Sequence, residues 1–338
     1  MTKSLKKANQ PTFIDLFSGI GGFRIGMEEA GFKHLFSNDY DKYANMTYRA
    51  WYGSERHLEA SLWDVDIKNE IPQHDVLCGG FPCQPFSNAG KKLGFKDEAQ
   101  GNLFFRIKEI IEQKRPKIVF LENVRTLLTH DNGNTFETIN LIMNQLGYIG
   151  EKEIINSKFW VPQNRHRVFL IYLDNSQFGL EQLDYVKQNL SLIAGGLGNS
   201  EQQFISIKEE NPSKEYEIPQ GTWESLQRHK ARHDSEGRGF GYQRIADFSK
   251  QTRTLSARYA KDGAEILIKE RYWRRPRKLT LTEAKLLMGF NDYYAKNYGH
   301  KKGFPIDICS KAQSYKQFGN SVVPKIVEEI ANILIKLF

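Results

Sequence analysis

The sequence predicts an α/β protein with a doubly wound, mostly parallel sheet and a smaller irregular domain inserted before the chain returns to the sheet. Between residues 12 and 173, short apolar segments alternate with amphipathic ones. This alternation is typical of a parallel sheet with helices on both faces. The alternation then stops, and residues 174–275 are polar and interrupted by glycines.

Each element of the first region has a recognisable pattern. Apolar runs predict strands, and apolar residues at helical spacing predict helices. The expected strands are 12–17, 34–39, 75–78, 117–123, 149–156 and 167–173. The expected helices are 24–31, closed by Gly31, then 41–51, 103–113 and 135–146.

The chain is expected to divide into two domains, with residues 1–173 and 276–338 forming the first and 174–275 the second. The stretch "AGGLGNS" at 194–200 is a spacer within the irregular region. Helical periodicity returns at 280–288 and 322–337. The last helix carries an apolar face that should pack on the sheet, made of Val323, Ile326, Val327, Ile330, Ile333, Leu334 and Leu337.

The amino-acid composition excludes several classes of protein. The chain has 338 residues, no apolar run long enough to span a membrane, and a polar N-terminal segment without a signal core. Its three cysteines, Cys78, Cys83 and Cys309, favour a reducing, cytoplasmic setting over a disulfide framework. They also lack the spacing of a zinc site, so we expect no metal.

The positive charge is concentrated in one stretch. Residues 223–278 contain 15 Lys and Arg against 7 Asp and Glu, a surplus that equals the net charge of +8 for the whole chain. Such a stretch is either a solvated basic face or a surface that follows the phosphates of a nucleic acid.

Four strand ends carry unusual residues, and in an open α/β sheet these ends meet at the ligand-binding edge. The first is followed by "GIGGF", a glycine turn that lets a ligand approach the backbone or merely helps packing. The turn departs from the dinucleotide pattern G-x-G-x-x-G. Asp39 ends the second strand and suits a ribose, and Tyr40 could stack on a base. A nicotinamide enzyme would explain these features but not the third strand end.

The third strand end leads into "GGFPCQPFS", which places Cys83 on a loop stiffened by prolines. A thiol held after a strand in this way suggests a nucleophile, while the alternative is a small cysteine packed under a turn. The fourth strand ends in "FLENV", where Glu122 is poorly solvated. Its pKa should rise, which suits a proton donor, although a carboxylate capping a helix is the alternative.

"QNRHR" at 163–167 places Arg165 and Arg167 on one side of a presumed strand, because alternate residues face the same way. One of them could bind a carbonyl or a phosphate of the substrate.

Six motifs in this order resemble the DNA (cytosine-5)-methyltransferases of bacterial restriction–modification systems. The resemblance covers nearly the whole chain and includes the S-adenosylmethionine-dependent, Rossmann-like methyltransferase fold. The motifs are "DLFSGIGGF", "GFPCQPFS", "ENV", "QNRHRVF", "RTLSARYAKDG" and "YKQFGNSVV".

The resemblance implies a covalent mechanism. Cys83 would attack C6 of cytosine, Glu122 would donate a hydrogen bond or proton to N3, and Arg165, with Arg167 nearby, would hold the O2 side. C5 would then take the methyl group, and the C5 proton and the thiol would leave.

The methyl donor implied is S-adenosylmethionine, with S-adenosylhomocysteine as the product. Asp39 would take the ribose hydroxyls, in place of the family's usual Glu, and Tyr40 would stack on the adenine, with Asp64 at its amino group. The full set of expected cofactor residues is Asp15, Phe17, Ser18, Gly19, Ile20, Gly21, Gly22, Asp39, Tyr40, Asp64, Val65, Pro82, Leu103, Asn320 and Val322.

The implied partner is double-stranded DNA, from which the target base must be flipped. The Cys83 loop would close over that base, and residues 174–275 would be the target recognition domain in the major groove. The expected DNA-binding residues are Ser87, Lys91, Lys92, Arg238, Phe240, Tyr242, Gln243, Arg244 and Arg258. The recognition stretch looks like that of enzymes that modify the inner cytosine of CCNGG or CCWGG, and a monomer would suffice.

The resemblance leaves two alternatives, a tRNA cytosine-5 methyltransferase and a catalytically inactive DNA-binding regulator. The first should have a short insert in place of residues 174–275, and the second should lack Cys83, Glu122 or Arg165. A cognate restriction endonuclease is the expected functional partner.

Overall fold

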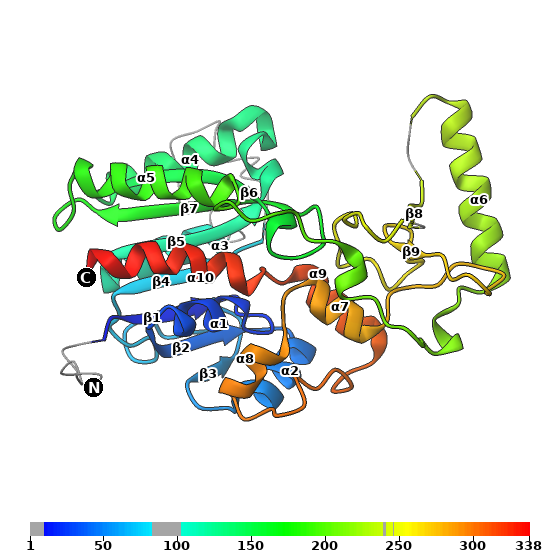
Figure 1. Cartoon of the computed structure of the whole chain (residues 1–338). Helices are drawn as coiled ribbons and strands as arrows, with labels where there is room; N and C mark the ends of the chain where they lie inside the picture. Colours follow the sequence, from blue (N-terminus) through cyan, green and yellow to red (C-terminus); the bar gives the residue numbers. More distant parts are fainter. Residues whose placement is uncertain (1–9, 83–102, 239–240, 246) are drawn as a thin grey trace.

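The computed structural model describes residues 10–82, 103–238, 241–245 and 247–338, and its centre is a seven-stranded sheet (Figure 1). The strands lie in the order β3-β2-β1-β4-β5-β7-β6, and within this sheet β7 runs in the direction opposite to the other six. Their bounds are β1 Thr12–Leu16, β2 Lys33–Asp39, β3 His57–Glu59, β4 Val76–Gly80, β5 Ile118–Val124, β6 Tyr148–Asn156 and β7 His166–Asp174. The predicted mostly parallel sheet is confirmed, and β3 is a short strand that no apolar run predicts.

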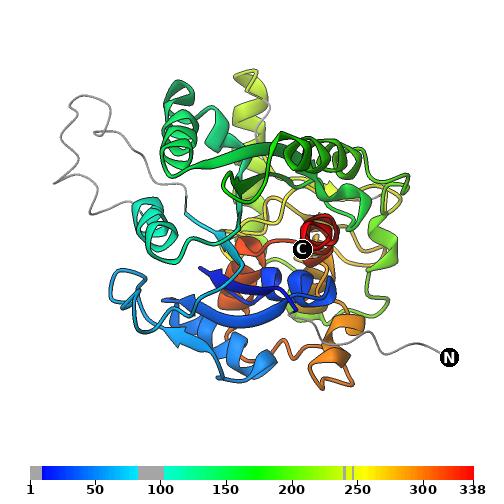
Figure 2. The same ribbon diagram turned by 90° about the vertical axis from the view of Figure 1, so that its left-hand side faces the viewer.

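Helices cover both faces of the sheet, with α3 and α4 on one side and α5 and α10 on the other (Figure 2). The helix α1 packs against α10 on the second side. The bounds are α1 Gly22–Glu29, α2 Lys42–Tyr52, α3 Leu103–Lys114, α4 Asn134–Gln145, α5 Leu180–Ala194 and α10 Pro324–Leu334. All of these except α5 coincide with predicted helices to within a few residues.

Alternate residues of the central strands enter two separate cores. Phe13 of β1 and Phe120 of β5 join the core under α1 and α10, while Ile14 and Leu121 join the core under α3 and α4. All four side chains are fully buried. Burial on both faces explains why these strands carry consecutive apolar residues rather than an alternation of apolar and polar ones.

The C-terminal helix lies directly on α1. A Cβ atom at Gly26 would lie 2.6 Å from the Cβ atom of Val327, so only glycine allows the two helices to come this close. The expected apolar face is buried at Ile326, Val327 and Ile330. The predicted packing of this helix on the sheet layer is therefore confirmed.

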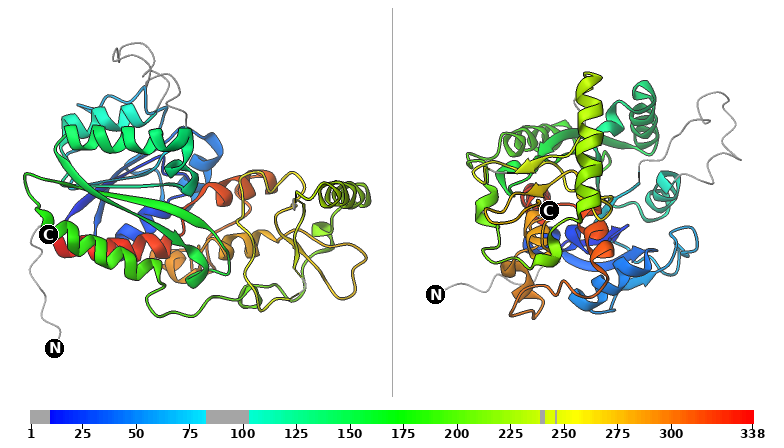
Figure 3. Two further views of the ribbon diagram at one scale, coloured as in Figure 1. Left: turned by 90° about the horizontal axis from the view of Figure 1, so that it is seen from above. Right: turned by 90° about the vertical axis from the view of Figure 1, so that its right-hand side faces the viewer.

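Two long helices lie within 174–275, where irregular structure was predicted, and over them that prediction is wrong. The side chains of α5 join the core of the sheet through Val186, Leu190 and Ile193, so this helix lies with the sheet. The helix α6, Gln220–Ser235, has no apolar periodicity that could predict it, because Leu226 alone among its residues is buried. Figure 3 shows α6 projecting at the end of the molecule away from the sheet. The two-residue strands β8 Arg244–Ile245 and β9 Leu267–Ile268 pair beside it.

Three helices lie between β9 and the C-terminal helix α10. They are α7 Leu281–Leu287, α8 Asp292–Asn297 and α9 Lys311–Asn320. The first matches its prediction and begins with a capping box, in which Thr280 and Glu283 each bond the other's backbone N–H. Among the helices described, none is both long and apolar enough to cross a membrane.

Candidate active site

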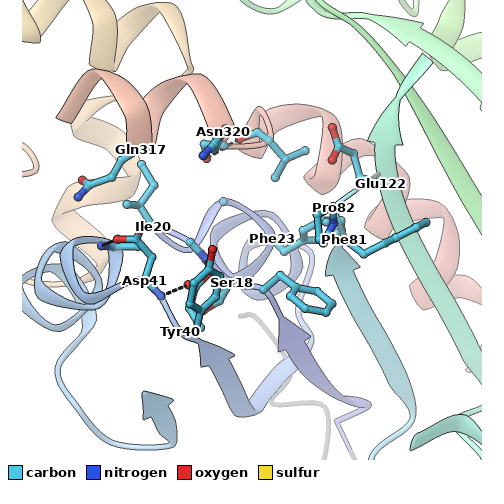
Figure 4. A pocket seen from close by; sticks show the side chains of 18 of the residues that line it. Ser18, Ile20, Phe23, Tyr40, Asp41, Phe81, Pro82, Glu122, Gln317 and Asn320 are labelled. Carbon is cyan, nitrogen blue, oxygen red and sulfur yellow. Dashed lines mark hydrogen bonds between the residues drawn. The ribbon is translucent and has the colours of Figure 1, made fainter. Parts of the chain in front are cut away.

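A cavity of about 600 Å³ lies at the carboxyl ends of the parallel strands (Figure 4). Its walls come from the turn after β1, the ends of β2 and β5, the segment after β4, and the end of α9 with the residues that follow it. Its volume is typical of sites for small organic ligands. The strand ends that the sequence predicted to converge are therefore brought together.

The turn after β1 forms the floor of the cavity in a left-handed conformation. Phe17, Gly19 and Gly21 have φ angles of 55°, 54° and 80°, and the phenylalanine is held there because the Ser18 amide bonds the Asn38 carbonyl at 3.0 Å. At Gly22, where α1 begins, a Cβ atom would lie 2.8 Å from the Val322 carbonyl oxygen. The close approach of this turn to Val322 therefore requires glycine at position 22.

Asp39 links this turn to the end of β2. Its carboxylate accepts hydrogen bonds from the Gly19 and Asp41 amides, each at 2.8 Å. Burial raises the pKa of Asp39, and these amides act in the opposite direction. Tyr40 next to it is 73% exposed at the cavity, so one ring face is open to a planar ligand.

The helix α9 is tied to α2 beside the same cavity. The ammonium group of Lys316 pairs with Asp41 at 2.6 Å, and the Thr47 hydroxyl donates to Gln317 at 2.9 Å. Lys316, Gln317 and Asp41 all line the cavity. These bonds fix the wall that carries Asn320.

Glu122 and Arg167 form an ion pair at the other end of the cavity. The Arg167 Nε lies 3.0 Å from a Glu122 carboxylate oxygen, and the two side chains are 16% and 12% exposed. Burial raises the pKa of Glu122, opposed first by Arg167 and then by Arg165. This environment favours a carboxyl group that can hold a proton and release it.

Arg165 is held differently from Arg167. It is 2% exposed, and its two Nη atoms donate to the carbonyls of Leu255, Gly319 and Ser321 at 2.8–3.0 Å. Most of its hydrogen-bonding capacity is directed at the protein's own backbone. The guanidinium that pairs with Glu122 at the cavity is that of Arg167, whereas Arg165 lines the cavity with its Nε atom unpartnered among the described residues.

The segment after β4 is anchored to the end of β5. The Asn123 side chain donates to the Phe81 carbonyl at 2.9 Å, in a buried position. Pro82 follows at the cavity wall. Asn123 therefore fixes the start of the segment that continues into Cys83, which lies outside the described residues.

Most of the expected cofactor residues line the cavity. They are Phe17, Ser18, Gly19, Ile20, Gly22, Asp39, Tyr40, Pro82, Leu103, Asn320 and Val322. The catalytic candidates Glu122, Arg165 and Arg167 line it too.

Four expected cofactor residues are not brought to the cavity wall. Asp64 is exposed and Val65 is buried in a core, because the turn around them presents Ser61, Leu62 and Trp63 instead. Gly21 faces Tyr52. Asp15 lies fully buried, and neither carboxylate oxygen has a hydrogen-bond partner among the described residues. Burial, and then the charge of Asp39, raises the pKa of Asp15 well above its ordinary value.

The expected DNA-binding residues either lie away from this cavity or fall outside the residues that the structure describes. Ser87, Lys91, Lys92 and Phe240 are outside the described residues. Arg238 is exposed and pairs with Glu236 at 3.1 Å, and Tyr242 packs edge-on against Trp223. Gln243 is partly buried, Arg244 lies in β8, and Arg258 is exposed.

Several cavity residues were missed by the sequence reasoning. The adjacent positions Asn38 and Asp41 could have been found from Asp39, and Asn123 from its motif "ENV". Residues 60–63 follow the unpredicted strand β3 and carry no periodic pattern. Lys316 and Gln317 lie one helical turn before Asn320, and helical spacing alone could have indicated them.

Replacing Gly22 with alanine should weaken ligand binding in the cavity. The new methyl group would press on Val322, whose backbone oxygen and Cγ1 each lie 2.8 Å away. We expect at least a tenfold loss of affinity, equivalent to about 1.4 kcal/mol, measured by calorimetry with S-adenosylhomocysteine as the probe. Gly221→Ala is the matched control because its Cβ atom would meet open space. Equal affinities for the two variants would contradict this role of Gly22.

Comparisons with known proteins agree on one family. A sequence profile described as "C-5 cytosine-specific DNA methylase" matches residues 11–336. The chain is 39% identical over 337 residues to the type II methyltransferase M1.ScrFI of Lactococcus lactis subsp. cremoris, covering 98% of this chain and 80% of that protein. It is 40% identical over 321 residues to the type II methyltransferase M.NlaX of Neisseria lactamica, covering 94% of each.

A solved structure supports the fold. The Dnmt2 methyltransferase of S. pombe superimposes with a TM-score of 0.73 over 97% of this chain and 99% of that one. The two sequences are 17% identical, so this likeness concerns the fold alone.

Proposed function

The chain belongs to the C-5 cytosine-specific DNA methylase family, and from this premise we propose that it transfers a methyl group from S-adenosylmethionine to C5 of a flipped cytosine in duplex DNA, through an adduct between Cys83 and C6. Family membership makes it a DNA (cytosine-5)-methyltransferase. The covalent adduct, the flipped base and the residue roles are the parts we propose.

One observation carries the proposal. A cavity with a cofactor-binding end, built from the turn after β1 and Asp39, shares its space with the ion pair of Glu122 and Arg167. Methyl transfer onto a ring carbon requires a proton donor and a cofactor site within the same cavity. The start of the Cys83 segment, Pro82, lies in the same wall.

The residues present fit S-adenosylmethionine. The turn after β1, which lines the cavity, would receive its methionine part. Asp39 has lone pairs for the ribose hydroxyls, and the exposed face of Tyr40 suits the adenine. When bound, the cofactor supplies a methyl group that a carbon nucleophile can accept. The described residues include no group of three or more metal-ligating side chains, and the absence of a metal stays a prediction.

The protein must make C5 of cytosine nucleophilic. The Cys83 thiolate forms a bond to C6, and Glu122 donates to N3 so that the ring can hold the added electrons. Arg167, placed at Glu122, is better positioned than Arg165 to hold the O2 side. After C5 takes the methyl group, a base removes the C5 proton and the S–C6 bond breaks.

We assign DNA binding to the segment between α5 and α7, where the positive charge is concentrated. Because α5 packs on the sheet, we propose that this recognition domain starts after residue 194 rather than at 174. A tRNA methyltransferase is not favoured, because the matched family and relatives are described as DNA and type II methyltransferases. An inactive regulator would have no use for the ion pair at Glu122.

The relatives' type II designation supports a role in restriction–modification, in which methylation protects host DNA from a cognate endonuclease. We expect a monomer that acts in the cytoplasm, where this DNA lies. The direct test is incorporation of labelled methyl groups from S-adenosylmethionine into duplex DNA and into tRNA by the purified chain. Label in tRNA alone, or in neither substrate, would refute the proposal.

Salt dependence should reveal the phosphate-contacting surface. Arg271 and Arg274 are exposed, whereas Arg275 is tied to Glu217 and the Ile218 carbonyl. Replacing Arg271 and Arg274 with glutamine should weaken binding to cognate and unrelated duplexes by the same factor. The slope of log affinity against log salt should fall by about two, because two phosphate contacts are lost.

Fluorescence anisotropy over a salt series measures both effects. Arg275→Gln is the matched control, and it should leave the salt slope unchanged. A loss confined to the cognate duplex would mean that Arg271 and Arg274 read bases.

The target sequence is expected to be CCNGG or CCWGG, with the inner cytosine modified. Bisulfite conversion of plasmid DNA treated with the purified enzyme should leave only those cytosines unconverted. Protected cytosines in GGCC or GCGC would exclude this target and leave the methyltransferase assignment in place.

A further inference from the structure

Arg165 joins two segments that are far apart in the sequence. Its Nη1 atom donates to the Leu255 carbonyl at 3.0 Å, and its Nη2 atom donates to Gly319 and Ser321 at 2.9 and 2.8 Å. Burial, and then the nearby charge of Arg167, lowers its pKa to about 9. A cation buried to this extent is compensated here mainly by three carbonyl groups, so its energy depends on both segments staying in place.

Gln163, two residues earlier, holds the other side of Leu255. Its Oε1 atom accepts from the Leu255 amide at 2.7 Å, and its Nε2 atom donates to the Leu287 carbonyl at 3.0 Å. Both backbone polar groups of Leu255 are therefore bonded to side chains from the segment just before β7. This double attachment leaves the backbone at Leu255 little freedom to shift alone.

The two segments also touch directly. A Cβ atom at Gly319 would lie 2.4 Å from the Ala257 nitrogen and from the carbonyl carbon and oxygen of Ser256. No side chain fits between them, so a displacement of either backbone must be taken up by the other. We call residues 255–257, 319–321 and Arg165 the joint.

Each side of the joint faces a different ligand under the proposed function. Gly319, Asn320 and Ser321 line the cofactor cavity. On the other side, Arg253 and Arg258 flank the joint and are exposed at the recognition domain. We propose that Arg165 is a positioning residue that couples DNA binding at 253–258 to cofactor binding at 319–322, an inference that rests on the proposed function.

The coupling follows from the fork of the guanidinium group. A ligand that fixes one segment fixes one or two of the three carbonyls that Arg165 must reach, which favours the arrangement that the second ligand needs. Lysine keeps the charge but cannot bond three carbonyls in a plane. Arg165→Lys should therefore weaken the linkage between the two ligands more than either affinity alone.

The test measures the dissociation constant of S-adenosylhomocysteine by calorimetry, with and without a saturating duplex that carries the methylated site found by mapping. In the unmodified protein the duplex should tighten binding by about 5-fold or more, the lower end of typical coupling. In Arg165→Lys the ratio of the dissociation constant without duplex to that with duplex should fall to near one. Arg56→Lys is the matched control, because it loses an arginine bond to a carbonyl, that of His34, remote from the joint.

A second variant perturbs the joint without touching Arg165. Gly319→Ala should also reduce the ratio, and Gly179→Ala should not, because its Cβ atom would make only an ordinary contact with Gln182 at 3.6 Å. If both joint variants fail to fold, hydrogen exchange on the unmodified protein decides: the duplex alone should slow exchange of the amides at 319–323.

Three results would overturn the proposal. They are a ratio of one in the unmodified protein, an unchanged ratio in folded Arg165→Lys, and, where exchange decides, no protection at 319–323 by the duplex. Methyl transfer by the unmodified protein alongside any of these would leave the proposed function intact.

Discussion

Replacing Cys83 with serine is expected to abolish methyl transfer while leaving the affinity for S-adenosylhomocysteine nearly unchanged. A serine hydroxyl is far less acidic than a thiol and a weaker nucleophile, so the bond to C6 cannot form at a useful rate. Loss of a nucleophile typically costs several orders of magnitude, and we expect a drop of more than about 10²-fold. Single-turnover incorporation of labelled methyl into duplex DNA gives the rate.

Cofactor binding should survive because the cavity is built from other elements. The turn after β1, Asp39 and the end of α9 hold their positions through bonds that do not involve Cys83. Cys309→Ser is the control, since this partly exposed thiol contacts Thr47 and the Tyr43 carbonyl away from the catalytic end. A Cys83→Ser variant that retains more than about a hundredth of the wild-type rate would refute the nucleophile assignment.

The parts of the fold that the sequence predicted are those in which burial dictates composition. The stretch Ile118–Leu121 of β5 is buried on both faces and is continuously apolar, and α10 has a wide apolar face. α6 could not be recognised in this way because it buries Leu226 alone. α5 buries one side on the sheet edge, and its exposed leucines, Leu180 and Leu192, blur its periodicity.

The residues of the candidate site likewise fall into those that the sequence could predict and those that it could not. Residues that lie directly at strand ends, such as Asp39 and Glu122, could be predicted because a parallel sheet brings its carboxyl ends together. Asp64 does not reach the cavity, because its position depends on an aperiodic turn after β3. The different environments of Arg165 and Arg167 depend on contacts with Leu255, Gly319 and Ser321, which no local pattern encodes.

The acid–base role of Glu122 has a distinctive pH dependence. Burial raises the pKa of its carboxyl group above the ordinary value. The protonated form therefore persists to higher pH than for an exposed glutamate, and it is lost as the pH rises through the raised pKa. If proton donation to N3 is required, the single-turnover rate should fall on the alkaline side of that pKa.

Replacing Glu122 with glutamine is expected to slow the chemical step by about 10²–10⁴-fold, the usual contribution of a positioned acid or base. The amide keeps the shape and can still donate a hydrogen bond to N3, but it cannot release a proton. The alkaline decline in rate should also disappear, which a merely structural role would not produce. Single-turnover rates between pH 5 and 9 would be compared with those of Glu151→Gln, which removes a surface partner of Lys187. An unchanged rate in Glu122→Gln, or an unchanged pH profile, would assign Glu122 to holding Arg167 in place rather than to catalysis.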